Sequence, residues 1–324
     1  MQPSVFVTGG SGFVGGAVIR SLTEDHQVKA MARSTTACDV VSKLGAIPVA
    51  CSLDEVEARH LEGSEVVIHC AAEAGEWAPP GRYYQTNVRG TNRLLEAARR
   101  AGIRRFVHIS TDSVLLTGVP LRDVNESFPI PETTPHDYAA TKAEGELAVI
   151  AANDPPKFET VAIRPCLVWG PGDTTILPEI KEMVTKGQFL WLSGGRQTIS
   201  TTNIRNLTAG IRLAMNGECS GEVFYITDEE PVQMRLFLEG YMGANGVDLP
   251  ARSVPARVAA MAARVIEGIW RKLRPDQKPP LTRLAVELLS LDHYITTDKA
   301  RRLLGYKPTV TIASGFEAIR SAIL

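Results

Sequence analysis

The segment TGGSGFVG, residues 8–15, decides the fold of this 324-residue chain. It follows the β-branched run SVFVT, which begins at Ser4, and precedes residues with the periodicity of a helix. In a strand, turn and helix of this kind, Gly9 permits the tight turn, Gly12 lets the backbone approach a pyrophosphate, and Gly15 allows close packing of helix and strand. The N-terminus of the helix then faces the phosphates. The pattern therefore predicts a dinucleotide site rather than a simple tight turn.

Short β-branched runs alternate with helical stretches from Ser4 to about residue 165. The predicted strands start near residues 4, 26, 46, 65, 104 and 159. Their apolar content is continuous, which is typical of strands buried in a parallel sheet with helices on both faces. We therefore predict an α/β fold with a Rossmann-type doubly wound parallel sheet.

The residues after the second predicted strand select the dinucleotide. A site for NAD usually carries Asp or Glu about 20 residues after the glycine loop, where the carboxylate accepts from the ribose. No acidic residue stands between Gln27 and Cys38, where the sequence MARST instead provides Arg33 and Ser34. Such a pair suits the 2′-phosphate of NADP, so we predict NADP rather than NAD; the alternative is that Arg33 is an ordinary exposed loop residue.

The predicted domains follow from where this alternation ends. Residues 1–170 form an NADP-binding Rossmann domain, and residues 171–324, where Pro and Gly interrupt more often, form a smaller substrate-binding region. A segment near residues 222–228 is expected to return to the main sheet, because EVFYITD has the composition of a strand.

Charge and cysteine content narrow the class of protein. Thirty-five basic and 36 acidic residues give a formal net charge of -1, which provides no global field for nucleic acid. No apolar run approaches the roughly 18 residues of a membrane span, so stable membrane insertion is not expected. The five cysteines contain no CxxC pair, the six histidines have no metal-ligand spacing, and Cys166 is expected to be a buried thiol. We expect a cytoplasmic protein without a metal, and the oligomeric state stays open, with a homodimer as one option.

Two further motifs carry polar side chains suited to proton transfer. PHDYAATKAEGELAVI, residues 135–150, predicts a turn and a helix, and Tyr138 and Lys142 share one face of it. A phenol has a pKa near 10, which a neighbouring ammonium lowers toward neutral pH. HISTDSV, residues 108–114, ends a predicted strand and places the Thr111 hydroxyl at the carboxyl edge of the sheet, where ligands of such folds bind.

The glycine loop, the strand-end hydroxyl and the YxxxK pair, in this order, resemble the short-chain dehydrogenase/reductase superfamily. The chain length and the form TGGSGFVG resemble its extended branch. Several other segments are similar to the bacterial 3β-hydroxysteroid dehydrogenase/isomerase-like group, which includes 2-alkyl-3-oxoalkanoate reductases. These segments are IHCAAEAGEW at 68, NVRGTNRLLEAAR at 87, STDSV at 110, YAATK at 138, RPCLVWGPGD at 164, GEVFYITDEEPV at 221 and KARRLLGYKP at 299.

The resemblance implies roles for individual residues. Tyr138 is the general acid/base, Lys142 activates it and binds the ribose, and Thr111 orients the carbonyl of the substrate. Ser113 stands where nucleotide-sugar dehydratases carry Glu, so a dehydratase is not expected. Ser52 stands before Leu53, where the branch usually has an acidic residue near the adenine, so that acidic contact is not carried over. Besides the glycines, Arg33, Ser34 and Lys142, the cofactor contacts implied are Phe13, Val14, Leu53, Ala71, Ala72, Pro165 and Val168.

The function that the resemblance implies is an NAD(P)-dependent oxidoreductase. It interconverts a ketone and a secondary alcohol on a bulky hydrophobic substrate, such as a hydroxysteroid or a 3-oxo lipid. Trp77 and Trp169 fall in segments that flank the substrate in this group, although ordinary core packing explains them equally well. One alternative is a nucleotide-sugar epimerase or reductase, which needs a basic, polar pocket. Another is a non-catalytic NADP-sensing or scaffold protein, for which Thr111, Tyr138 and Lys142 are unnecessary.

Residues 255–273 have the periodicity of one amphipathic helix. Its apolar positions are Val258, Met261, Val265, Ile269 and Leu273, and its basic positions on another face are Arg257, Arg264 and Arg271. From residue 252 to residue 283 there are eight basic and two acidic side chains. We expect this helix and Trp169 to wall an apolar substrate cleft, with the basic residues solvated; a role at a membrane surface is the alternative.

Overall fold

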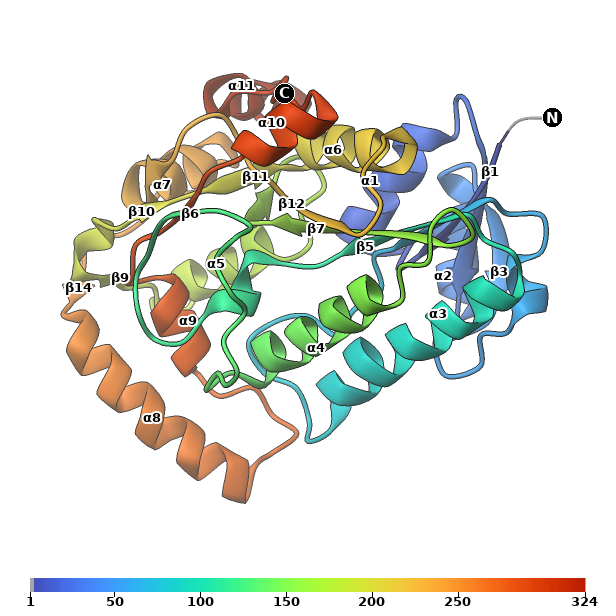
Figure 1. The fold of residues 1–324 in the computed structure, drawn as a ribbon. Helices are drawn as coiled ribbons and strands as arrows, with labels where there is room; N and C mark the ends of the chain where they lie inside the picture. Colours follow the sequence, from blue (N-terminus) through green and yellow to red (C-terminus); the bar gives the residue numbers. More distant parts are fainter. Residues whose placement is uncertain (1–2, 324) are drawn as a thin grey trace.

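The computed structural model describes residues 3–323 and has a seven-stranded parallel sheet at its centre (Figure 1). The strand order is β12-β7-β5-β4-β1-β2-β3, so the chain winds outward in both directions from β1 and β4. The seven strands are β1 (Ser4–Thr8), β2 (Gln27–Ala32), β3 (Ile47–Ala50), β4 (Val66–His69), β5 (Arg105–Ile109), β7 (Glu159–Pro165) and β12 (Glu222–Ile226). The predicted doubly wound α/β fold is thereby confirmed.

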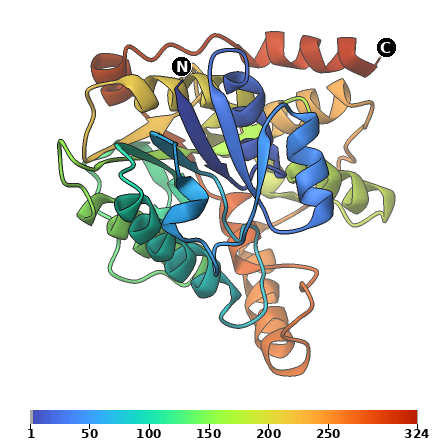
Figure 2. The same ribbon diagram turned by 90° about the vertical axis from the view of Figure 1, so that its right-hand side faces the viewer.

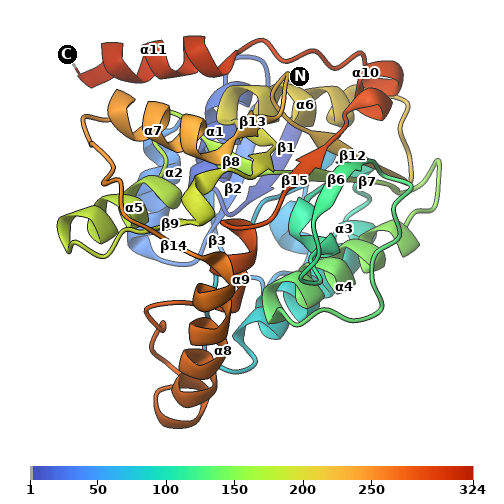
Figure 3. The ribbon, with the colours of Figure 1, turned by 90° about the vertical axis from the view of Figure 1, so that its left-hand side faces the viewer.

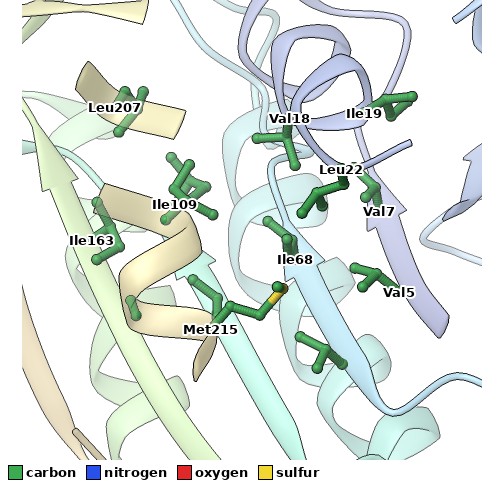
Figure 4. Packing of buried hydrophobic residues seen from close by; sticks show 14 of the residues in the cluster. Val5, Val7, Val18, Ile19, Leu22, Ile68, Ile109, Ile163, Leu207 and Met215 are labelled. Carbon is green, nitrogen blue, oxygen red and sulfur yellow. The ribbon is translucent and has the colours of Figure 1, made fainter. Parts of the chain in front are cut away.

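Helices cover both faces of this sheet (Figure 1). On one face lie α1 (Phe13–Leu22), α2 (Thr35–Lys43), α6 (Ile204–Asn216) and α10 (Asp298–Leu304), and on the other lie the π-helix η2 (Tyr84–Gly90), α3 (Thr91–Arg100) and α4 (Asp137–Ala151). Figure 4 shows the first core, in which Val5 and Val7 of β1 pack with Leu22 of α1. Phe6, between them in sequence, belongs to the core on the opposite face. Both faces of β1 are therefore buried, which explains its continuous apolar sequence.

Strand β3 differs from the buried strand that its sequence predicts. It lies at the edge of the sheet, paired only with β2, and the side chain of Ile47 is 48% exposed. Its second residue, Pro48, has no N–H to offer to another strand, which suits an edge position. A short apolar run therefore does not by itself distinguish an edge strand from a central one.

The segments after residue 170 form a second layer of shorter elements, apart from β12, which pairs with β7 in the main sheet, and apart from α6 and α10, which cover one face of that sheet. Together with pieces of the first part of the chain they make one four-stranded sheet, β13-β10-β15-β6, and the pairs β8–β11 and β9–β14. These strands are β6 (Leu121–Val124), β8 (Leu167–Trp169), β9 (Trp191–Leu192), β10 (Thr198–Ile199), β11 (Thr201–Asn203), β13 (Val232–Gln233), β14 (Ser253–Val254) and β15 (His293–Ile295). The remaining helices are α5 (Ile176–Thr185), α7 (Met234–Ala244), α8 (Ala256–Leu273), α9 (Arg283–Leu288) and α11 (Ile312–Ile323), with short 3₁₀ turns at η1 (Ala58–Leu61), η3 (Asp112–Leu115) and η4 (Ser193–Gly195).

Helix α8 stands apart from this arrangement. Figures 2 and 3 show it projecting from the body of the molecule, with α9 beside it. Within residues 3–323, no helix combines the length and the apolar content needed to cross a membrane.

Candidate active site

The glycine loop brings β1, α1 and the end of β4 into contact. Gly9 has a φ of +69°, and a Cβ on it would lie 2.7 Å from the backbone nitrogen of Ala71. A Cβ on Gly15 would lie 2.2 Å from the carbonyl oxygen of Gly9. Helix α1 begins after Gly12, and within residues 3–323 no side chain caps it. Its first backbone N–H groups are therefore donors for an anion, as a pyrophosphate site requires.

A buried chain of hydrogen bonds fixes the loop after β4. The N–H of Ala71 donates to Thr8 Oγ1 (3.1 Å), which lies 2.7 Å from His69 Nδ1, and His69 Nε2 lies 3.0 Å from Thr91 Oγ1. Thr91 uses its proton on the carbonyl of Asn87 (2.7 Å), so we assign the proton of His69 to Nε2. Burial lowers the pKa of His69 to about 3, which keeps the ring neutral. Ala71 is thus held in place beside the glycine loop.

Asn87 extends this scaffold to helix α4. Its Oδ1 accepts from the N–H of Glu73 (2.9 Å), and its Nδ2 donates to the carbonyl of Glu73 (3.1 Å) and to Thr141 Oγ1 (3.2 Å). Asn87 stands in the NVRGT motif, which by itself predicts no role for it. Its importance lies in joining segments that are distant in sequence, which a motif alone does not reveal.

Tyr138 and Lys142 lie in the first turns of α4, and Thr111 follows the end of β5. Burial raises the pKa of Tyr138 to about 12, while a hydrogen bond with Thr111 acts in the opposite direction. Lys142 is buried and donates from Nζ to the carbonyl of Ile109 (2.7 Å). Burial lowers the pKa of Lys142 to about 8, against the effect of Glu146. The phenol pKa thus moves upward, whereas the sequence predicts that the ammonium lowers it, because removal from water and the nearby carboxylate of Asp112 both raise it.

The other predicted cofactor residues follow the carboxyl ends of several parallel strands. Arg33 is exposed directly after β2, and Ser34 Oγ accepts from the N–H of Ala37 (3.2 Å) as the N-cap of α2. Pro165 ends β7, and Val168 lies half-buried in β8. These positions and the glycine loop therefore share one edge of the sheet.

Four predicted contacts have a packing role as well. Phe13 is buried in the first core and Val14 packs partly against it. Leu53 is buried on the opposite face of the sheet, and Ala71 packs against that core. Ala72 is half-buried beside it.

Two cavities adjoin these residues. The first, of about 380 Å³, is lined by Tyr138, Trp77, Glu267 and Arg271 among others, and we name it the Tyr138 cavity. The second, of about 230 Å³, contains Thr111 in its wall, and we name it the Thr111 cavity. Its apolar lining consists of Leu167, Ile176, Ile180, Met183, Ile199, Met234, Leu238, Ala285, Leu288 and Leu289. Glu76 borders both cavities.

The two tryptophans have different environments. Trp77 lines the Tyr138 cavity, donates from Nε1 to the carbonyl of Pro275 (3.0 Å), and lies under the guanidinium of Arg271 at 5.2 Å. Trp169 is fully buried and donates from Nε1 to Asp228 (2.7 Å). It packs against the rings of Phe237, Tyr241 and Phe316. The structure therefore places Trp77 beside the candidate site and Trp169 in a core.

Sequence analysis missed a buried ion pair in the wall of the Thr111 cavity. Asp112 Oδ2 lies 3.1 Å from His293 Nε2, and Asp112 Oδ1 accepts from the Thr111 hydroxyl (3.1 Å). Burial favours the neutral acid, but His293 lowers the pKa of Asp112 below its usual value. Burial also raises the pKa of Cys166, which lines the same cavity. Asp112 stands inside the quoted STDSV motif, whereas nothing in the sequence around His293 points to this role.

Helix α8 is present where predicted, but its expected orientation is wrong. Its five apolar side chains are between 45% and 75% exposed, and its buried residues are Ala259, Ala263 and Glu267. Glu267 accepts from Arg283 through the backbone N–H (2.6 Å) and Nε (2.7 Å), which holds this face against α9. The helix therefore presents Glu267 and Arg271 to the Tyr138 cavity instead of an apolar wall.

The chain is similar to known proteins both in sequence and in fold. Residues 6–256 match the model of the 3-beta hydroxysteroid dehydrogenase/isomerase family. The chain is 39% identical to a 4-hydroxy-2-methyl-3-oxo-4-farnesyl-3,4-dihydroquinoline-1-oxide ketoreductase of Stigmatella aurantiaca, over 98% of this chain and 96% of the relative. It is 34% identical to a 2-alkyl-3-oxoalkanoate reductase of Stenotrophomonas maltophilia, over 98% of each. The crystal structure of a UDP-glucuronic acid 4-epimerase from Bacillus cereus in complex with NAD has a TM-score of 0.75 at 20% identity, covering 99% of this chain and 100% of that one, and shows the shared fold.

Proposed function

The chain belongs to the 3-beta hydroxysteroid dehydrogenase/isomerase family, and from this premise we propose that it reduces a ketone on a bulky hydrophobic substrate to a secondary alcohol with NADPH. The observation that carries the proposal is the placement of Thr111, Tyr138 and Lys142 at one sheet edge, beside two cavities. Both relatives compared above are named as reductases of a 3-oxo compound. Their shared reaction and the residues of this site support the same chemistry here.

The reaction needs a hydride at the carbonyl carbon and a proton at the carbonyl oxygen. When bound, the nicotinamide dinucleotide supplies the hydride. Tyr138, with its raised pKa, stays protonated at neutral pH and donates its proton to the oxygen. Lys142 uses one of its three protons on Ile109, which leaves two donors for ribose hydroxyls. The Thr111 hydroxyl turns from Asp112 to the substrate carbonyl and orients it.

The lining of the Thr111 cavity favours an apolar substrate. Ten of its residues are apolar, and among the described lining residues there is no Lys or Arg. Three carboxylic residues, Glu76, Asp112 and Glu179, border it. Glu76 and Glu179 pair with Lys278, and Asp112 pairs with His293, so these described groups offer no free cation to the diphosphate of a nucleotide sugar, whose desolvation is then uncompensated. The cavity therefore supports a hydrophobic ketone over the epimerase alternative.

The preference for NADP rests on Arg33. Its guanidinium is exposed directly after β2, where the adenine ribose binds in folds of this type, and α2 begins beside it with Ser34 as N-cap. Asp39 is the nearest acidic residue that follows, and it lies inside α2. A guanidinium and a helix N-terminus both favour a 2′-phosphate.

We also propose a division of labour along the chain. Residues 1–170 bind the dinucleotide, and residues 171–324 shape the substrate site. The apolar lining of the Thr111 cavity supports this division, because all of it except Leu167 comes from the second part.

A panel of substrates tests the proposal. The purified protein is assayed for loss of NADPH or NADH absorbance with a 3-oxosteroid, a 2-alkyl-3-oxoalkanoate and a farnesylated quinoline ketone, and for epimerisation of UDP-glucuronic acid. We expect turnover of at least one hydrophobic ketone with NADPH and none of the UDP-sugar. Epimerisation without ketone reduction supports the nucleotide-sugar alternative, and tight NADPH binding without any turnover supports the sensor alternative.

A further inference from the structure

Helix α8 carries an apolar surface that the protein itself does not cover. Its five exposed side chains, Val258, Met261, Val265, Ile269 and Leu273, follow one another at helical spacing, and we name them the outer stripe. They are five of the thirteen large hydrophobic side chains that are exposed in residues 3–323. Isolated exposed apolar residues are ordinary, but a continuous stripe marks an interaction surface.

The inward contacts of α8 fix this orientation. Glu267 is buried and holds Arg283 of the α9 region through two hydrogen bonds, and Arg271 pairs with Asp137 at 3.1 Å. Rotating the helix to hide the outer stripe would strip Glu267 of its partner and bury basic side chains instead, and both changes are unfavourable. The outer stripe is therefore a stable feature of the folded protein.

The charge beside the outer stripe indicates what it contacts. Arg257, Arg264 and Lys272 are exposed next to the stripe, and none has an ion-pair partner among residues 3–323; we name them the basic flank. Glu267, the single acidic residue of α8, points inward. Residues 252–283 contain eight basic and two acidic side chains, although the whole chain has a net charge of -1. An apolar stripe with an unpaired basic flank is the pattern of a helix that lies in the interface of an anionic bilayer.

A second copy of the chain fits this surface less well. In an antiparallel pair of α8 helices the two basic flanks would meet, and in a parallel pair each flank would meet apolar residues without an acidic partner. The helix has 18 residues and so is about 27 Å long, which offers less than the roughly 800 Å² per partner of a stable interface. Its projection from the body exposes it to a flat surface (Figure 3).

We propose that α8 docks the protein onto an anionic lipid bilayer, with the outer stripe inserted among the acyl chains and the basic flank at the headgroups. The opposite side of the helix supplies Glu267 and Arg271 to the Tyr138 cavity, so docking brings this cavity close to the bilayer. A hydrophobic ketone dissolved in the membrane then has a short path to the site. That last link rests on the proposed function, whereas the docking itself does not.

Vesicle flotation tests the docking without substrate or cofactor. The full-length protein is mixed with vesicles of phosphatidylcholine alone, or of phosphatidylcholine with an equal amount of phosphatidylglycerol, at low salt. We expect it to float with the anionic vesicles and to remain in solution with the neutral ones. Failure to float with the anionic vesicles would overturn the proposal.

Variants separate the two parts of the surface. Met261→Gln with Val265→Gln removes the centre of the outer stripe and should weaken binding roughly tenfold or more. Arg257→Gln, Arg264→Gln and Lys272→Gln together should weaken it on the order of 100-fold and abolish its salt dependence. Unchanged binding in either variant would overturn the proposal.

A matched control and a competing outcome complete the test. Leu236 on α7 is 63% exposed, as Val265 is, so Leu236→Gln removes an equal apolar exposure elsewhere and should leave vesicle binding unchanged. Circular dichroism checks that each variant is folded. A dimer in sedimentation velocity that the Met261→Gln and Val265→Gln variant dissociates, without vesicle binding by the original protein, would assign the outer stripe to a second copy and overturn the proposal.

Discussion

Helices α4 and α8 border the same Tyr138 cavity but relate to the rest of the protein in opposite ways. Both bury mainly small and charged residues. In α4 these include Ala139, Lys142, Ala143 and Glu146, with Val149 as the one large apolar residue, and in α8 they are Ala259, Ala263 and Glu267. The charges of α4 are held by the central sheet, since Lys142 donates to Ile109 and Glu146 pairs with Arg164. In α8, the carboxylate of Glu267 is held, among the described residues, only by Arg283, at the start of the short helix α9.

This difference shows what helical periodicity does and does not determine. A 3.6-residue pattern predicts a helix and the presence of two unlike faces. It does not determine which face is inward when a charged residue with a fixed partner lies on the polar side. In α8, the Glu267–Arg283 contact sets the rotation, and the apolar face is left for another surface.

The largest effect is expected at Tyr138, because α4 holds the proton donor. Tyr138→Phe keeps the ring but removes the acid, so turnover of the ketone should fall by roughly 10² to 10⁴, with NADPH binding unchanged. Steady-state kinetics and NADPH titration measure the two quantities. Tyr83 provides the control, since its phenol lines the same cavity and its ring lies 5.9 Å from that of Tyr138. Tyr83→Phe should cost less than tenfold, and an equal loss in both variants would refute the assigned role.

The second prediction concerns two buried carboxylates, Glu146 of α4 and Glu267 of α8. Glu146 binds Arg164 through two hydrogen bonds, and both side chains are nearly inaccessible to water. Glu146→Gln leaves the guanidinium without its counter-charge and should lower the free energy of unfolding by about 3–5 kcal/mol. Glu267→Gln should lower it by only about 1–2 kcal/mol, because the side chain of Arg283 is 32% exposed and water replaces the lost partner. Urea unfolding measures both, and equal losses would show that α8 is as firmly integrated as α4.

The parts of the site that the sequence predicts are those encoded within one short segment. Gly9 and Gly15 are required by a turn and a close helix–strand contact only a few residues apart, and Tyr138 and Lys142 are one helical turn apart. These relations depend on local geometry, which a motif records. The doubly wound parallel sheet followed from the alternation of strand and helix runs along the chain, whereas the order of its strands did not.

The parts that the sequence does not predict depend on contacts between distant segments. The partnership of Asp112 and His293 joins η3 to β15, and the orientation of α8 depends on Arg283 beyond its own end. Trp169 shows the same limit, since only the packing of α7 and α11 around it distinguishes a core position from a substrate wall. Composition and periodicity do not contain this information, because it arises when the chain folds.

The pH dependence of kcat/KM should depend on the buried ammonium of Lys142 in α4. Burial lowers the pKa of Lys142 to about 8, so its ammonium is present below this pH and lost above it, while Tyr138, with a pKa raised to about 12, remains protonated. We expect kcat/KM for ketone reduction to fall about tenfold per pH unit above pH 8. Lys142→Arg keeps a cation at all these pH values and should remove this fall, even at reduced activity. The same descending limb in Lys142→Arg would exclude Lys142 as its source.

A smaller effect distinguishes basic residues that bind one phosphate from those that face a surface. Arg33→Ala should raise the KM for NADPH by roughly tenfold, because one charge-assisted contact is lost, and should leave the KM for NADH unchanged. Arg100→Ala, at the exposed end of α3, is the control and should change neither. Replacement of the basic flank of α8 by Gln should change neither the KM for NADPH nor the KM for NADH. Comparable KM values for the two cofactors in the original protein would contradict the predicted preference.

The smallest effect tests whether α8 unfolds together with the body. Gly268 in α8 and Gly243 in α7 are both exposed, and a Cβ on either would meet nothing within 4 Å. Replacement of each by Ala should stabilise its helix by about 0.5–1 kcal/mol. Since α7 packs into a core, Gly243→Ala should raise the global free energy of unfolding. Since α8 buries only three of its residues, Gly268→Ala should mainly slow hydrogen exchange of the α8 amides, by about fourfold, with a smaller global change. Equal global gains would mean that α8 is part of the same cooperative unit as α7, in spite of its exposed stripe.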